Sequence, residues 1–179
     1  MPATALFQKR LALILCGLSF ISRAVIELVF HPDYYEPRTR IDHAAVILMS
    51  LSLITLAWAL WGSFIKRPNE PGRAELVMRI ALFIACISAM TAGISNFIED
   101  WFDINALGMV WVVGILTLTA AMLVAGISAF WVSFVPRWKV VLLAAGSVAF
   151  VFFPIGHLLL GAALIGMALS RPKTNLVLR

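Results

Sequence analysis

The chain has 179 residues, of which 62% are hydrophobic and 13% are charged, and its mean hydropathy is +0.98. Soluble domains carry about 25% charged residues, so this composition excludes a soluble globule. Disordered chains and coiled coils need more charge, and a disulfide-stapled secreted domain needs more than the two cysteines present. The composition therefore predicts an all-α, polytopic transmembrane helical bundle.

Five apolar stretches are long enough for a helix to cross a hydrocarbon core of about 30 Å. In chain order they cover about residues 11–30, 44–65, 76–98, 104–134 and 140–170. The connections between them are short, so we expect residues 1–179 to form a single integral-membrane helical domain.

Positive charge near the ends of the spans predicts orientation, because Lys and Arg stay on the cytoplasmic side. Basic residues precede the first span and fill the second and fourth loops, whereas the first and third loops are acidic. We therefore expect a plasma (inner) membrane protein with a cytoplasmic N-terminus. Five spans would place the C-terminus outside, which conflicts with the basic residues Arg171, Lys173 and Arg179.

The fifth stretch contains Pro154 and Gly156 and is longer than a single crossing needs. Each half alone would be short for a crossing, and non-helical backbone inside a membrane requires surrounding protein or water. The sequence therefore favours one long, kinked and tilted helix. Six spans, or a re-entrant C-terminal hairpin, are the alternatives.

Small residues spaced four apart allow membrane helices to approach each other closely. The third span carries such a stripe, formed by Ala81, Ala85, Ala89 and Gly93. Weaker stripes follow on the fourth span, at Ala121, Ala125 and Ala129, and on the fifth span, at Ala162, Gly166 and Ser170. We expect these stripes to pack within the bundle, and contact with another subunit is the alternative.

Arg23 and Glu27 are ionisable residues inside the first span, and their spacing places them on one face of a helix. The simpler interpretation is an intramembrane ion pair that neutralises itself. The alternative is that Glu27 binds a proton or a cation.

The predicted outer surface collects further acids that are candidates for catalysis, because carboxyl groups transfer protons to and from substrates. Together with Glu27, these candidates are Glu99, Asp100 and Asp103. The segment from Asn96 to Asp103 also contains interfacial aromatic residues. Its Asn-x-x-Glu-Asp pattern resembles small bacterial multi-pass proteins in general, and this resemblance implies no activity.

Histidine and carboxylate side chains are also ligands for transition metals. The weak candidates in the first loop are His31, Asp33, Asp42 and His43. Their spacing matches no compact metal motif, so no metal is favoured.

His157 is the one histidine deep inside an apolar stretch. An intramembrane histidine can ligate a haem or a chlorophyll-type pigment, or it can form a hydrogen bond to a neighbouring helix. We expect His157 to pack beside the break at Pro154, with a role as cofactor ligand as the alternative.

No nucleotide-binding loop, nucleophile elbow or Cys-x-x-Cys pair is present in the sequence. The favoured function is therefore a non-catalytic accessory or scaffold subunit of a larger membrane complex, with membrane lipids and other membrane-protein subunits as partners and no nucleic acid. No cofactor is predicted, and lipid or pigment binding stays open. The first alternative is a small membrane enzyme acting on a lipid or isoprenoid substrate, and the second is a transporter or channel.

Overall fold

The computed structural model describes residues 3–32, 39–61, 72–102, 104–131, 137–152 and 154–169. These residues form helices and no strand. Four long apolar helices, each able to cross a membrane, are α1 (Ala3–Phe30), α2 (Arg40–Trp61), α3 (Arg73–Phe102) and α4 (Gly108–Ala129). The short 3-10 helix η1 (Asn105–Leu107) joins α3 to α4, and α5 (Arg137–Phe152) and α6 (Pro154–Leu169) complete the chain. The expected fold class, a helical membrane bundle, is confirmed.

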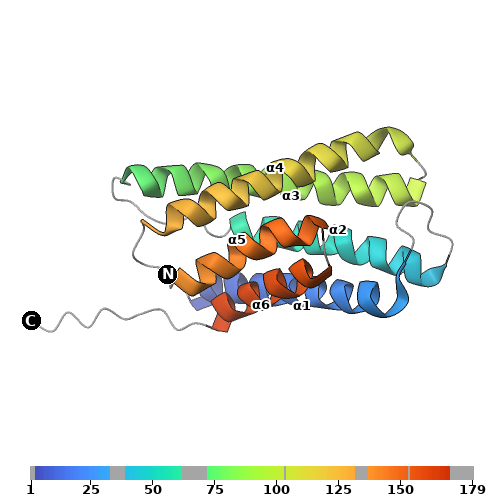
Figure 1. Cartoon of the computed structure of the whole chain (residues 1–179), viewed down its shortest axis with the longest axis horizontal. Coiled ribbons are helices and arrows are strands. Elements are labelled where there is room, and N and C mark those ends of the chain that lie inside the picture. Colours follow the sequence, from blue (N-terminus) through green and yellow to red (C-terminus); the bar gives the residue numbers. More distant parts are fainter. Residues whose placement is uncertain are drawn as a thin grey trace, which may run out of the picture.

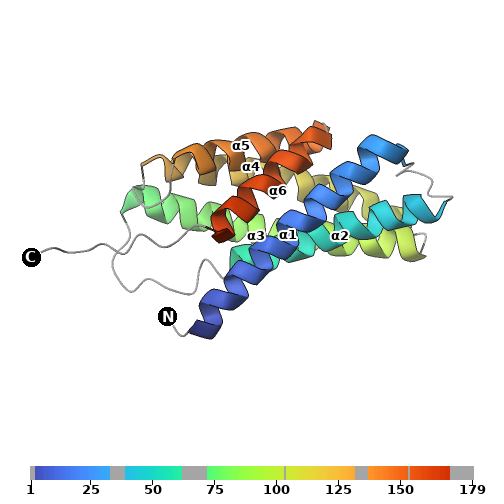
Figure 2. The same ribbon diagram turned by 90° about the horizontal axis from the view of Figure 1, so that it is seen from below.

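The helices form a closed sequence of neighbours. Each helix packs against the next one along the chain, and α6 returns to pack against α1 (Figures 1 and 2). The long helices alternate in direction (Figure 1). The last residues of α1 and α3 therefore lie at the same end of the bundle as the first residues of α2 and α4. We call the end where α1 begins the N-terminal end, and the opposite end the far end.

The C-terminal region differs from the expected single kinked helix over residues 140–170. It forms two helices, α5 and α6, which run in opposite directions and pack against each other (Figure 1). Sixteen residues in each helix correspond to about 24 Å at 1.5 Å per residue, which is less than a full crossing. Figure 1 shows the tip of this hairpin stopping short of the far end. The structure therefore has the re-entrant hairpin that was the alternative.

Two physical reasons explain the hairpin. Pro154 has no backbone N–H and cannot continue α5, while Gly156 lets the backbone of α6 lie directly against Ala149 and Phe150. The tip is also covered by protein, because Phe150 and His157 are 4% and 3% exposed. Side chains on both sides of the break therefore pack inside the bundle, while Ile155 is exposed.

The hairpin also places the last helix on the side that the charges require. Helix α6 ends at Leu169 at the N-terminal end, where α1 begins (Figures 1 and 2). Basic residues after Leu169 lie outside the described residues, but the chain approaches them from the end predicted to be cytoplasmic. The conflict between five spans and a basic C-terminus therefore disappears.

The small residues of α3 lie inside the bundle. Ala81, Ala85 and Ala89 are at most 4% exposed, and Gly93 is buried against α2. On the fourth helix, Ala121, Ala125 and Ala129 are buried as well. In contrast, Ala162 of α6 is exposed, and Gly161 is the residue that contacts α1.

Candidate functional site

Arg23 and Glu27 form a buried ion pair on α1. The Nε and Nη2 atoms of Arg23 donate hydrogen bonds of 3.1 and 2.9 Å to Oε1 of Glu27. The two side chains are 8% and 10% exposed. Because two donors of one planar guanidinium reach the same oxygen, the pair is charge-assisted and fixed in orientation.

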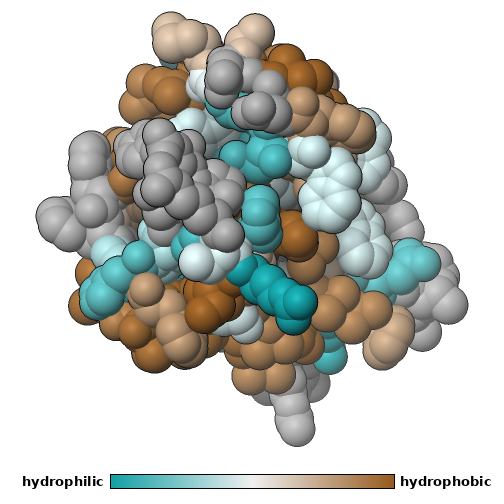
Figure 3. All heavy atoms as spheres, turned by 90° about the vertical axis from the view of Figure 1, so that its right-hand side faces the viewer, coloured by the Kyte–Doolittle hydropathy of each residue, from teal (hydrophilic) through white to brown (hydrophobic). Residues whose placement is uncertain are grey.

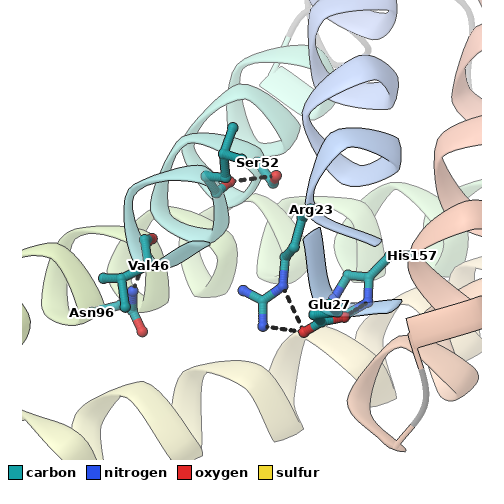
Figure 4. A network of polar contacts seen from close by, with 7 residues as sticks. Arg23, Glu27, Val46, Ser52, Asn96 and His157 are labelled. Carbon is teal, nitrogen blue, oxygen red and sulfur yellow. Dashed lines mark hydrogen bonds and ion pairs between the residues drawn. The ribbon is translucent and has the colours of Figure 1, made fainter. Parts of the chain in front are cut away.

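His157 brings a third ionisable side chain to this pair from the first turn of α6. Its Nδ1 atom lies 3.2 Å from Oε2 of Glu27, and its ring packs against Phe20 and Phe150 with centroid distances of 5.9 and 5.7 Å. Figure 4 shows Glu27 between Arg23 and His157, on the facing sides of α1 and α6. We call Arg23, Glu27 and His157 the buried triad.

The local sequence explains how the buried triad assembles. Phe20, Arg23 and Glu27 are three and four residues apart, so they follow one face of α1, and that face packs on α6. The break at Pro154 places His157 at the tip of the hairpin rather than in the middle of a long helix. With His157 neutral, the charges of Arg23 and Glu27 cancel, and this balance limits the cost of burial.

The Nε2 atom of His157 is buried and has no hydrogen-bond partner within the part of the chain that the structure describes. Packing of the ring against Phe20 and Phe150 leaves its Nδ1 side facing Glu27. Both imidazole nitrogens of His157 therefore lie inside the bundle without a hydrogen bond to the described residues, with Nδ1 next to the Glu27 carboxylate and Nε2 on the other side of the ring.

The candidate acids at the end of α3 lie at the far end. A Cβ atom at Gly108 would lie only 2.7 Å from Oε1 of Glu99, which places the Glu99 carboxylate at the first residue of α4. Negative charge is favourable there, because a helix N-terminus carries partial positive charge. Asp100 interacts electrostatically with Glu99 and with His43 of α2. Asp103 lies outside the described residues.

Asn96, one turn before these acids, connects α3 to α2. Its Nδ2 atom donates to Oγ of Ser50 at 2.9 Å. The same atom donates to the carbonyl of Val46 at 3.5 Å, and Figure 4 shows Asn96 beside Val46. Ser50 is 2% exposed, so this contact lies inside the bundle. Hydrogen bonds between membrane helices stabilise their association modestly, by about 1 kcal/mol.

Three of the four weak metal candidates of the first loop lie within the described residues, and each of them lies at the end of a helix. The backbone N–H of Thr39 donates to Oδ2 of Asp42 at 2.7 Å, and that of Asp42 donates to Oγ1 of Thr39 at 3.2 Å, which together cap the start of α2. His31 ends α1 with a positive φ of 46°, and His43 is exposed. Asp33 lies outside the described residues. Among the residues that are described, no group of three His, Cys, Asp or Glu side chains is placed to hold a metal ion.

The far end combines these polar groups on one surface. Figure 3 shows hydrophilic side chains gathered across the middle of this end, with hydrophobic side chains around them. The buried triad lies deeper in the bundle, below the level of the helix ends. The two groups of polar residues therefore differ in depth, although Asp42 at the start of α2 is also buried, at 6% exposed.

A separate apolar groove opens on the surface of α2 and α3. It has a volume of about 350 Å³, and its lining residues are Ile54, Thr55, Ala57, Trp58, Trp61, Cys86 and Met90. Trp58 and Trp61 are 46% and 53% exposed, and they lie toward the N-terminal end, where α2 ends. The groove is open to the surroundings of the bundle rather than to its centre.

Sequence reasoning paired Arg23 with Glu27 and identified His157 separately, but it did not bring His157 to this pair. The signal was indirect, because only the break at Pro154 allows α6 to turn back along α1. It also missed the contact between Gly17 and Gly161, where a Cβ atom on either residue would lie within 2.7 Å of the other residue's carbonyl oxygen. Glycines at both positions, within apolar stretches, were the available signal.

Comparison of the chain with known protein families, with curated proteins and with solved structures finds no match. The functional argument therefore depends on the geometry of this molecule.

Proposed function

We propose that this protein is a non-catalytic accessory subunit of a larger membrane assembly, located in the plasma (inner) membrane with its N-terminus in the cytoplasm. One observation supports the proposal: three of the acids that are candidates for catalysis or metal binding have structural contacts. Glu27 pairs with Arg23 and His157, Glu99 lies at the start of α4, and Asp42 caps α2. Acids committed in this way are poor general acids or bases.

Because the small residues of α3 pack inside the bundle, we expect a partner to contact other side chains. Ala81, Ala85 and Ala89 are buried within the bundle, so they are not available to a second subunit. A partner would instead contact large apolar side chains on the outer surface. The groove between α2 and α3 is a concave feature suited to this, and its Trp58 and Trp61 side chains are typical of membrane-protein contact surfaces near the interface.

The experiment is to extract the protein from its native membrane in mild detergent and to measure its native mass and the stoichiometry of co-purifying polypeptides. We expect it to migrate as part of a larger complex at a fixed ratio. Met90→Trp would fill the groove and should reduce this co-migration. Val113→Trp, on the exposed face of α4, is the matched control and should leave it unchanged.

Migration of the wild-type protein alone would contradict the accessory role. In that case the first alternative, a lipid-modifying enzyme, would be tested by Asp100→Asn. Asp100 is the candidate acid that lies beside both a second carboxylate and a histidine, an arrangement suited to proton transfer.

A further inference from the structure

We infer that Glu27 and His157 form a proton-binding site inside the bundle, and that uptake of one proton releases the hairpin tip from α1. This site is separate from the partner contacts proposed above. It would make the position of the α5–α6 hairpin depend on pH.

The first step concerns charge. In the closed bundle Arg23 is positive, Glu27 is negative and His157 is neutral, so the buried triad has no net charge. A further proton on His157 would leave one net positive charge among side chains that are at most 10% exposed. Burying an ion without compensation costs several kcal/mol. The closed bundle therefore disfavours the extra proton.

The second step concerns where the proton binds. The Nδ1 side of the imidazole faces Glu27, while Nε2 is buried with no hydrogen-bond partner among the described residues. Movement of the tip away from α1 would expose Nε2 to water and allow it to accept a proton. A ligand that binds one of two states more tightly shifts the population toward that state. Here the ligand is the proton, and the favoured state is the detached hairpin.

The third step concerns competing charges. On α1 and directly after it, the titratable residues nearest to the site are Arg23, Glu27 and His31, whose backbone N–H donates to the carbonyl of Glu27. Further along α1 is the buried Cys16, whose thiol donates to the carbonyl of Ser52 on α2. Helix α2 carries no titratable residue between positions 44 and 61, and α5 carries none between positions 141 and 152. His157 is the only titratable residue of α6. No neighbouring helix therefore supplies a second carboxylate that would neutralise a protonated His157.

The fourth step concerns the element that moves. The hairpin is joined to α1 at the buried triad and at the contact between Gly17 and Gly161, about one helical turn deeper along α6. Pro154 begins a new helix after α5, and Gly156 packs directly against Ala149 and Phe150, so the tip is held together by its own α5–α6 contact. Loss of the contact between Glu27 and His157 would therefore release the tip, while the glycine contact holds the rest of α6.

The test measures the distance between α1 and the hairpin tip in the full-length protein, reconstituted in phosphatidylcholine vesicles. Spin labels are attached at Val29 and Ile155, which are 60% and 59% exposed, with Cys16 and Cys86 replaced by alanine. As pH falls from about 8 to about 5, we expect a second, longer distance to appear. Its ratio to the short distance should rise by up to about tenfold per pH unit, the limit for uptake of one proton.

His157→Gln is the decisive variant. Its side-chain amide can still donate to Glu27, but it cannot take up a proton in this pH range, so the short distance should persist at every pH. His43→Gln removes an exposed histidine at the start of α2 and should respond as the wild type does. A wild-type distance that does not change with pH, or an equal change in His157→Gln, would overturn the inference.

A second measurement applies even where a labelled variant folds poorly. The chain has three histidines, so nitrogen NMR of ¹⁵N-histidine-labelled protein gives few imidazole signals, and His157→Gln identifies the signal of His157. We expect His157 to gain its proton over the same pH range in which the long distance appears. A His157 signal that stays neutral throughout this range would contradict the proposed site.

Discussion

Two helix contacts in this bundle bring helix backbones close together through different residues. Between α3 and α4, Met78 and Ala81 pack with Ala125 and Ala129, and Ala92 lies against Gly114. Between α1 and α6, Gly17 and Gly161 give an equally close approach, but the contact also contains Arg23, Glu27 and His157. The part of the first contact that these residues form is apolar, and the second contact includes three ionisable side chains.

This difference indicates that close helix packing does not require the ionisable side chains of the α1–α6 contact. Association of membrane helices depends largely on close packing of small residues, and the α3–α4 contact achieves this with apolar side chains. The α1–α6 contact has its own pair of glycines, so the buried triad adds desolvation cost to a contact that could pack without it. A role beyond packing, such as binding a proton, is the reason that we propose for its presence.

The strongest way to break the α1–α6 contact is to act on its glycines. Gly161→Leu would place a side chain where a Cβ atom already lies 2.6 Å from the carbonyl oxygen of Gly17. The obstacle is backbone, which cannot rotate away, so the cost should exceed the about 1–3 kcal/mol typical of overpacking. We expect little folded, monodisperse protein by size-exclusion chromatography.

The control for this variant is Ala162→Leu, one residue further along α6, where the side chain is exposed. We expect wild-type recovery of folded protein from this variant. Equal losses from both variants would mean that α6 tolerates no enlargement, and that the glycine contact is not special.

Removal of one charge from the buried triad should have the next largest effect. Arg23→Gln leaves Glu27 without its bidentate partner, and breaking a buried ion pair costs about 3–5 kcal/mol. The free energy of unfolding can be measured in mixed micelles by titration with dodecyl sulfate. The double variant Arg23→Gln, Glu27→Gln restores neutrality and should recover much of the loss. A double variant as unstable as Arg23→Gln would show that charge balance is not the cause.

The helical membrane bundle was predictable because its signal lies in long apolar stretches, each visible on its own. Capping of α2 by Thr39 and Asp42 also follows a local pattern of side chains three residues apart. Pairing of Glu27 with His157 was not predictable in the same way, because the two residues lie far apart in the sequence. Their meeting depends on whether the chain turns back at Pro154.

The hairpin shows that the local sequence around Pro154 does not by itself determine whether the chain turns back. Pro154 is compatible with a kink or with a complete break, and both arrangements leave the same residues in the membrane. The choice depends on whether other helices cover the exposed backbone, and here α1 does so through Phe20 and its neighbours. Three sequence features pointed to the hairpin: the length of the fifth stretch, the presence of Pro154 and Gly156, and the basic residues after position 170.

A substitution in the α3–α4 contact should destabilise the protein less than Arg23→Gln does. Ala81→Leu adds volume at a position that is 4% exposed between α3 and α4, and overpacking of this kind costs about 1–3 kcal/mol. Ile80→Leu, at a neighbouring position that is 51% exposed, should change the free energy of unfolding little. If Ala81→Leu costs more than Arg23→Gln in the same micelles, the α3–α4 contact, and not the triad, is the more sensitive of the two.

The smallest effect is expected away from both contacts, at the start of α2. Thr39→Ala removes the hydroxyl that accepts from the backbone N–H of Asp42, and loss of such a cap costs about 1 kcal/mol. Thr39→Ser keeps the hydroxyl and should retain nearly all of the stability, as measured by the same titration. The variant also bears on the role of Asp42, since its carboxylate accepts from the backbone N–H of Thr39. If Thr39→Ala is destabilising while Thr39→Ser is not, the polar side chains at the start of α2 have a structural function as a cap. This outcome would contrast with the buried triad, whose charges neither packing nor capping explains.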